Sequence, residues 1–379
     1  IPAKLRKYNN VVEAAHWARV MLKLSGTTVH ELISLPGNQI TSRFTLIGLT
    51  FYVIWFSVYL YCTFVTYYED QTIVRMLHNT KLRRYGDDFE RCSSIMFAVI
   101  TMILTPWKLN GNREMVRKIV DIDMIIEKAG HIIDYDKLAN TAISVSLGQI
   151  IVCFIRMICI YLALSSSISM PVEKMFQVCM ADSLAVITTS LYCYQLLILI
   201  DRFKWINKTL REIKGRNSWE YKVFIRGKVP DNMNKVTELQ DRQICEKIKT
   251  CAKVYSMVFD SCKSTCRSFG FSLLFTLLYY FNYIILYLFY FMEANAAGLF
   301  HDLKRYFDFL VYTFWEITIA LGIIFLIIVF SELTFTFLRA FNYYFLQAMK
   351  LSIQLLHEMP SFTVCGLFNL DYAYLQQVS

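Results

Sequence analysis

Three ionisable residues lie deep inside long apolar runs, where charge is costly. Arg156, Asp182 and Glu316 each interrupt a different run. At 1.5 Å per helical residue, Arg156 and Glu316 would both lie about 14 Å below the outer ends of their runs. Asp182 would lie about 10 Å below the outer end of its own run. The sequence therefore predicts that Arg156 pairs with Glu316, with Asp182 as a competing partner. Such a group is either a polar chamber for a ligand or a structural ion pair, and the residues alone leave both open.

Further polar and aromatic residues fall in the same half of these runs. Pockets for small molecules are mostly apolar with a few placed polar groups, and aromatic faces stack equally well on sugar rings or planar alkaloids. Taken singly, each aromatic residue is also explained by packing or by anchoring at a membrane surface. Beyond the three charges, the candidate ligand-binding residues are Tyr161, Thr188, Thr189, Ser190, Tyr279, Tyr280, Asn282, Tyr283, Tyr312 and Trp315.

The sequence lacks motifs for covalent chemistry. His30 and Glu31 begin like the zinc motif H-E-x-x-H, but residue 34 is Ser34. The 13 glycines form no phosphate-binding loop, and no G-x-S-x-G occurs. The 11 cysteines show no metal-binding spacing, since Cys262 and Cys266 have no histidine nearby. We therefore expect no enzyme, no catalytic residue, no metal and no cofactor.

Composition indicates which elements must position the candidate residues. Hydrophobic residues make up 56% of the 379 residues and charged residues 18%, against about 45–50% and about 25% in soluble domains. Runs of about 20 apolar residues cross a bilayer as helices. We therefore predict an all-α, polytopic membrane protein. Its membrane helices are expected at 44–68, 92–107, 138–164, 175–200, 268–292 and 306–330.

The positions of the basic residues predict the orientation. Segments on the side of the N-terminus hold 26 Lys and Arg residues, and segments on the other side hold 8. Because cytoplasmic loops carry the excess of positive charge, the N-terminus is expected in the cytoplasm. This orientation explains the net charge of +9 without a nucleic-acid partner. The segment 203–263 alone holds fourteen of these residues, and 241–263 shows helical spacing that would extend the fifth membrane helix.

The most specific stretch lies near the end of the chain. Residues 352–375 read SIQLLHEMPSFTVCGLFNLDYAYL, in which Gly366 beside Cys365 permits close backbone approach. This stretch resembles the segment that leads into the last helix of insect gustatory receptors. An amphipathic or re-entrant tail is the alternative interpretation. The matching positions are Gln354, Leu355, His357, Phe362, Cys365, Gly366, Phe368, Leu370 and Asp371.

The resemblance implies a seven-helix receptor, of which six helices and the start of the seventh are expected here. It implies a homotetrameric, tastant-gated, non-selective cation channel in the plasma membrane. The ligand chamber would lie among the outer halves of the first six helices. In the family, the last helix continues past the position that corresponds to Ser379. We therefore expect its pore-lining part to be missing from this sequence, and we expect 339–342 to join pieces that are not adjacent in the natural protein. The tetramer anchor would comprise 203–263, 331–360 and 362–371.

Five regions follow from this interpretation. They are a cytoplasmic segment 1–43, membrane helices one to four in 44–202, a cytoplasmic anchor 203–263, membrane helices five and six in 264–340, and 341–379 leading into helix seven. The expected partners are a small-molecule tastant, identical subunits, lipid and permeant cations. The form of the motif favours bitter compounds slightly over sugars.

Three other classes of protein are alternatives to a gustatory receptor. An insect odorant receptor is the nearest alternative, and the C-G-x-F-x-L-D pattern favours the gustatory branch. A transporter would usually show inverted repeats or paired broken helices. A G-protein-coupled receptor is suggested by Asp201, Arg202 and Phe203, but this triplet follows the fourth predicted helix rather than the third, and no N-P-x-x-Y occurs. An interfacial charge pair is the simpler interpretation of that triplet.

Overall fold

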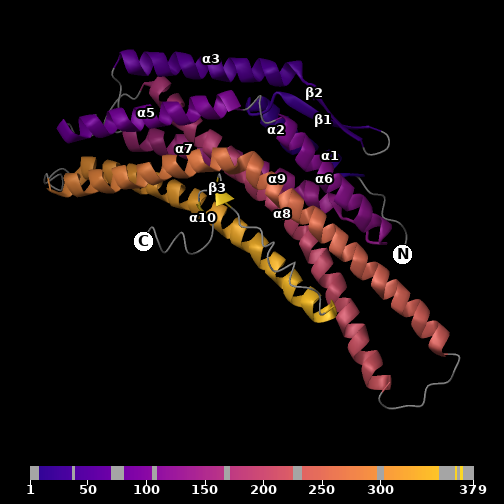
Figure 1. The fold of residues 1–379 in the computed structure, drawn as a ribbon. Helices are drawn as coiled ribbons and strands as arrows, with labels where there is room; N and C mark the ends of the chain where they lie inside the picture. Colours follow the sequence, from indigo (N-terminus) through magenta and orange to yellow (C-terminus); the bar gives the residue numbers. More distant parts are fainter. Residues whose placement is uncertain are drawn as a thin grey trace.

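The computed structural model describes residues 8–35, 39–69, 81–104, 109–165, 171–224, 233–296, 303–349, 363–364 and 368–369. Within these residues the chain forms long helices with a two-stranded hairpin at one side (Figure 1). The helices are α1 (Val11–Ala14), α2 (His16–Leu24), α3 (Leu46–Tyr68), α5 (Lys81–Leu104), α6 (Leu109–Lys128), α7 (Tyr135–Ser165), α8 (Val172–Phe224), α9 (Met233–Ala296) and α10 (Leu303–Met349). The strands are β1 (His30–Leu35), β2 (Gln39–Phe44), β3 (Thr363–Val364) and β4 (Phe368–Asn369).

Among the residues described, 5 helices are long and apolar enough to cross a membrane. These stretches coincide with five of the six predicted runs, so the chain is a polytopic membrane protein. The stretches are Leu46–Tyr68 in α3, Tyr135–Tyr161 in α7, Val172–Ile213 in α8, Glu246–Ala296 in α9 and Phe309–Arg339 in α10.

The remaining predicted run, 92–107, falls partly on α5. This helix begins at Lys81, and its first half reads KLRRYGDDFER, which is mostly polar and charged. That composition keeps α5 from qualifying as a membrane span by length and hydropathy, although its second half is apolar. Residues 105–108 lie outside the described part of the chain. A sixth membrane helix at this position stays a prediction.

The hairpin of β1 and β2 corrects the prediction of an all-α fold. The two strands pair antiparallel from His30 opposite Phe44 to Leu35 opposite Gln39. The rings of His30 and Phe44 meet edge to face, with centroids 4.2 Å apart. β-Branched and aromatic residues on these strands favour extended backbone over helix. The hairpin packs against α6 and, with α1 and α2, forms what we call the N-terminal end of the bundle.

A second correction concerns the expected start of helix seven. Thr363–Val364 and Phe368–Asn369 are extended and pair antiparallel, with Val364 opposite Phe368. These four residues are therefore not helical. Two of them, Thr363 and Val364, are β-branched, which lowers helix propensity and favours strands. Strand β3 lies against α9.

The core lies where α8, α9 and α10 pack together. α8 has 53 residues, α9 has 64 and α10 has 47, so each is longer than a bilayer requires. Tyr192 of α8 and Ser331 of α10 share a hydrogen bond of 2.8 Å, and both are buried. Figure 1 shows α8 and α9 running on together past the rest of the bundle. We call the other end of the bundle, where α7 ends at Ser165 and α8 begins at Val172, the opposite end.

Candidate functional site

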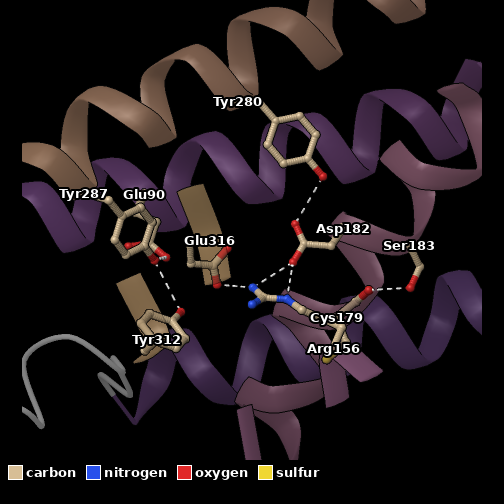
Figure 2. Close-up of polar contacts among 9 residues, drawn as sticks. All are labelled: Glu90, Arg156, Cys179, Asp182, Ser183, Tyr280, Tyr287, Tyr312 and Glu316. Carbon is tan, nitrogen blue, oxygen red and sulfur yellow. Dashed lines mark hydrogen bonds and ion pairs between the residues drawn. The ribbon is translucent and has the colours of Figure 1, made fainter. Parts of the chain in front are cut away.

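Arg156, Asp182 and Glu316 meet inside the bundle, and we call them the Arg156 cluster (Figure 2). Arg156 comes from α7, Asp182 from α8 and Glu316 from α10. Arg156 Nε and Nη2 each lie 2.9 Å from Asp182 Oδ2, and Nη2 also donates to Glu316 Oε1. All three are buried, with Arg156 only 2% exposed. One guanidinium therefore joins three helices.

The cluster's charges do not cancel one for one. Two carboxylates share one guanidinium, so the formal charge is −1 when both acids are ionised. Buried charges are expensive unless they are paired and hydrogen-bonded. Tyr280 Oη adds a donor to Asp182 Oδ1 at 3.5 Å. Arg156 Nη1, in contrast, has no hydrogen-bond partner among the described residues. The cluster thus holds an unused donor and an excess carboxylate, so its bonding is incomplete.

A column of tyrosines on α9 runs beside the Arg156 cluster. The ring centroids of Tyr279 and Tyr283 are 4.4 Å apart, those of Tyr283 and Tyr287 5.7 Å, and those of Tyr287 and Tyr290 5.9 Å. The spacing of three or four residues puts them on one helix face. All four are buried. Phe97 of α5 stacks on Tyr279 with centroids 4.7 Å apart.

Glu90 of α5 joins this network and was not among the predicted residues. Tyr287 Oη donates to Glu90 Oε1 at 3.1 Å and lies 3.3 Å from Tyr312 Oη (Figure 2). Tyr312 lies one helical turn before Glu316 on α10, so the column reaches the Arg156 cluster. Glu90 sits at the edge of the apolar run that begins at 92, and this border position is the pattern that would have identified it.

Other predicted residues lie apart from the cluster. Tyr161 is 62% exposed, so it faces away from the bundle interior. Asn282 is half-buried and has no printed polar contact. Thr188 and Thr189 are buried on α8, but Thr188 lines a different cavity, described below. Trp315 is partly buried, and its Nε1 has no hydrogen-bond partner among the described residues. Aromatic character alone did not separate the exposed side chain of Tyr161 from the buried ones.

Most of the C-terminal motif lies outside the described residues. Of its matching positions, only Phe368 falls in a described element, β4. Gln354, Leu355, His357, Phe362, Cys365, Gly366, Leu370 and Asp371 are not described. Their predicted role in an anchor stays a prediction.

A second buried ion pair lies toward the N-terminal end, and we call it the Arg202 clamp. Arg202 Nε and Nη2 donate to the two oxygens of Asp123 at 2.9 and 2.8 Å. Tyr135 Oη donates to Asp123 Oδ2 at 3.1 Å. The sequence suggested a pair between neighbours, but Asp201 lies 3.7 Å from Lys204 instead. Arg202 reaches across to α6, a contact that spacing along the chain does not reveal.

The described residues show no metal centre. No group of three or more His, Cys, Asp or Glu residues is placed to hold a metal ion within them. Nine cysteines among these residues are free thiols.

The long apolar helices, joined inside by buried charge, define a multi-pass membrane protein. Residues 26–378 match the family described as 7tm Chemosensory receptor. The chain therefore belongs to the 7tm chemosensory receptor family, a family of membrane receptors rather than enzymes. No protein of established description matches the chain in sequence.

Proposed function

We propose that the chain is a gustatory receptor that acts as a tastant-gated, non-selective cation channel, with four identical subunits in the plasma membrane and the N-terminus in the cytoplasm. The observation that carries the proposal is the Arg156 cluster in a chain of the chemosensory receptor family. It places an incompletely bonded guanidinium between three helices. The motif in 362–371 supports the gustatory branch over the odorant branch.

The proposed mechanism is an exchange of hydrogen bonds at Arg156. A ligand hydroxyl or carbonyl would take the free donor of Nη1 and compete with Glu316 for the rest of the guanidinium. Loss of the Glu316 bond would loosen α10 from α7. Because α10 continues to Met349, a shift at Glu316 is carried to the far end of that helix. Tyr312 and Tyr287 would follow, since they bond each other and Glu90.

Each ligand needs only a modest preference for the open state over the closed state. Changing the ratio of open to closed channels from 1:99 to 99:1 takes about 5.5 kcal/mol of differential binding. Divided over four identical sites, this is about 1.4 kcal/mol per ligand, or a tenfold difference in affinity between the two states. One or two changed hydrogen bonds at a buried charge are of this size.

The ligand would be small and largely aromatic or apolar with a few polar groups. The tyrosine column offers flat apolar faces, and the Arg156 cluster offers both donors and acceptors. We favour bitter or other non-sugar compounds over sugars, on the form of the C-terminal motif. No nucleic acid, cofactor or G protein takes part in this scheme.

Whole-cell recording from the full-length protein, expressed alone, tests the proposal. The expected result is a cation current evoked by a bitter compound that persists under G-protein blockade. A response confined to sugars or to volatile odorants would overturn the ligand class or the branch. Silence with confirmed surface expression, together with a monomer on subunit counting, would overturn the channel.

A paired substitution locates the site. Glu316→Gln should shift the agonist concentration for half-maximal current about tenfold, because Arg156 loses one of its two competing acids. Glu332→Gln is the matched control, since it makes the same change on the same helix outside the Arg156 cluster. Equal dose–response curves for the two variants would remove Glu316 from the pocket.

A further inference from the structure

A cavity of about 160 Å³ lies at the N-terminal end of the bundle, and no residue of the Arg156 cluster lines it. Its walls come from α1, α2 and β1 on one side and from α5, α6, α8 and α9 on the other. On α8 it is lined from Leu184 to Ile198, whereas Asp182 lies closer to the opposite end. We call it the N-terminal cavity.

The only charged side chain among the described residues lining this cavity, besides the titratable His30, is Arg19. Its guanidinium donates to the main-chain oxygens of Val12, Ala15 and Leu32. A guanidinium has five N–H groups, so three such bonds leave two unused. The carbonyls fix its position but do not neutralise its charge.

Arg19 forms no ion pair in the described part of the chain. No carboxylate there forms an ion pair with it, because the nearby Glu31 is engaged by Lys23 at 2.9 Å. Burial lowers the pKa of Arg19, and the charge of Glu31 offsets only part of this effect. A cation removed from water is stabilised by an anion placed against it.

Two further polar groups point to a ligand. Tyr194 is 6% exposed and Gln195 is half-buried, and both line the N-terminal cavity. Tyr194 Oη and Gln195 Oε1 are buried, with no hydrogen-bond partner among the described residues. Leaving a buried polar atom unbonded is unfavourable, and such atoms are usually satisfied by something. Both groups lie on the α8 wall, and Arg19 lies on the α2 wall of the same cavity.

The rest of the lining sets the character of the ligand. Met115 and Ile119 of α6, Leu191 of α8 and Phe269 of α9 give an apolar wall. No Asp or Glu is among the described lining residues, so nothing there would hold a cation. The cavity therefore pairs one anion-binding end with an apolar remainder.

We propose that the N-terminal cavity binds a small monocarboxylic acid, with its carboxylate against Arg19 and Tyr194 and its apolar tail between α6, α8 and α9. Gln195 contributes a donor after a half-turn of its amide. The site lies between α1, α2 and β1 on one side and the long helices on the other. A bound acid would therefore strengthen the packing of α1, α2 and β1 against those helices. The acid comes either from the membrane as a fatty acid or from solution, and both sources present the same chemistry.

The test is photolabelling of the full-length protein in lipid nanodiscs with octanoate that carries a diazirine on its tail. Mass spectrometry should map the label to α6, α8 or α9 residues of the cavity, and unlabelled octanoate should compete while octanol and octylamine do not. Arg19→Gln should reduce labelling about tenfold, the loss of a charge-assisted contact. Arg117→Gln removes the same charge from the exposed face of α6 and should leave labelling unchanged.

Further variants keep the proposal falsifiable if Arg19→Gln does not fold. Tyr194→Phe should reduce labelling about threefold to tenfold by the loss of one hydrogen bond, with exposed Tyr161→Phe as its control. Ala18→Phe fills the cavity without changing charge and should abolish labelling. Labelling that maps elsewhere, or that persists in Ala18→Phe and Tyr194→Phe, would overturn the proposal.

A separate measurement, of the acid that co-purifies with the protein, identifies the source of the ligand. Fatty acid recovered from protein purified in detergent assigns the site to a membrane lipid product. Labelling by added octanoate with no co-purified acid assigns it to a soluble acid. Absence of both overturns the proposal. These readouts are of binding alone, so they stand or fall independently of channel activity.

Discussion

The Arg156 cluster and the Arg202 clamp are two solutions to the burial of a guanidinium in one bundle. Arg202 faces one carboxylate, Asp123, with two parallel bonds of 2.9 and 2.8 Å. Arg156 is shared by Asp182 and Glu316, and one of its nitrogens is unbonded among the described residues. The clamp is matched in charge and geometry, whereas the cluster is over-supplied with acid. A matched pair resists rearrangement, and an over-supplied one has an alternative arrangement available.

The largest expected effect comes from removing Arg156. Arg156→Met leaves two buried carboxylates facing each other and should lower the free energy of unfolding by roughly 3–5 kcal/mol. Neutralising both acids in the same chain, with Asp182→Asn and Glu316→Gln, should restore most of that loss because no buried charge remains. Thermal unfolding in detergent, followed by size-exclusion chromatography, measures both. A triple variant no more stable than Arg156→Met would contradict the charge argument.

The next effect separates the two regions directly. Asp123→Asn leaves Arg202 without its acid and should lower the free energy of unfolding by roughly 3 kcal/mol. Glu316→Gln leaves Arg156 paired with Asp182 and should lower it by about 1 kcal/mol or less. The same thermal assay compares the two variants. Equal losses would show that the cluster is as closely matched as the clamp.

Smaller effects are expected at the tyrosines that border each region. Tyr287→Phe removes bonds to Glu90 and Tyr312 and should lower the free energy of unfolding by about 1–2 kcal/mol. Tyr135→Phe removes one bond to Asp123 and should lower it by about 1 kcal/mol. Exposed Tyr161→Phe should stay within about 0.5 kcal/mol of the wild type and serves as the control.

The smallest effect is a pH dependence beside the clamp. Burial, with the charges of Lys208 and Arg202, lowers the pKa of His131 from its ordinary value of 6.5. The unfolded chain therefore binds this proton at higher pH than the folded one, so stability should fall as the pH drops through 6.5. His131→Gln should flatten the difference between melting temperatures at pH 5 and pH 7.5. An unchanged difference would assign the dependence to other groups.

Residue type and depth along apolar runs were enough to predict five of the membrane helices and the partners of Arg156. Charges inside such runs must find each other, so their depths carry information. Glu90 was missed because it lies where a charged segment gives way to an apolar one. The Arg202 clamp was missed because Asp123 is distant in sequence and Asp201 is adjacent.

The N-terminal cavity was beyond the reach of sequence patterns for a related reason. The segment 1–43 was interpreted only as cytoplasmic, while in the structure α1, α2 and β1 line a cavity together with α5, α6, α8 and α9. Arg19 looked like one of several orienting basic residues. Its bond to the oxygen of Leu32 depends on strand β1, which the prediction of an all-α fold did not include. Tertiary folding of a polar segment leaves little periodicity to detect.

Because α9 is one continuous helix, a tilt at one point along it displaces its distant end. With 64 residues and 1.5 Å per residue, the helix is about 96 Å long. Tyr280, which touches the Arg156 cluster, is about 70 Å from the end at Met233. A tilt of about 4° at that fulcrum would displace the far end by about 5 Å, close to one helical turn. A small tilt of α9 beside the Arg156 cluster would therefore produce a large displacement at the other end of the same helix.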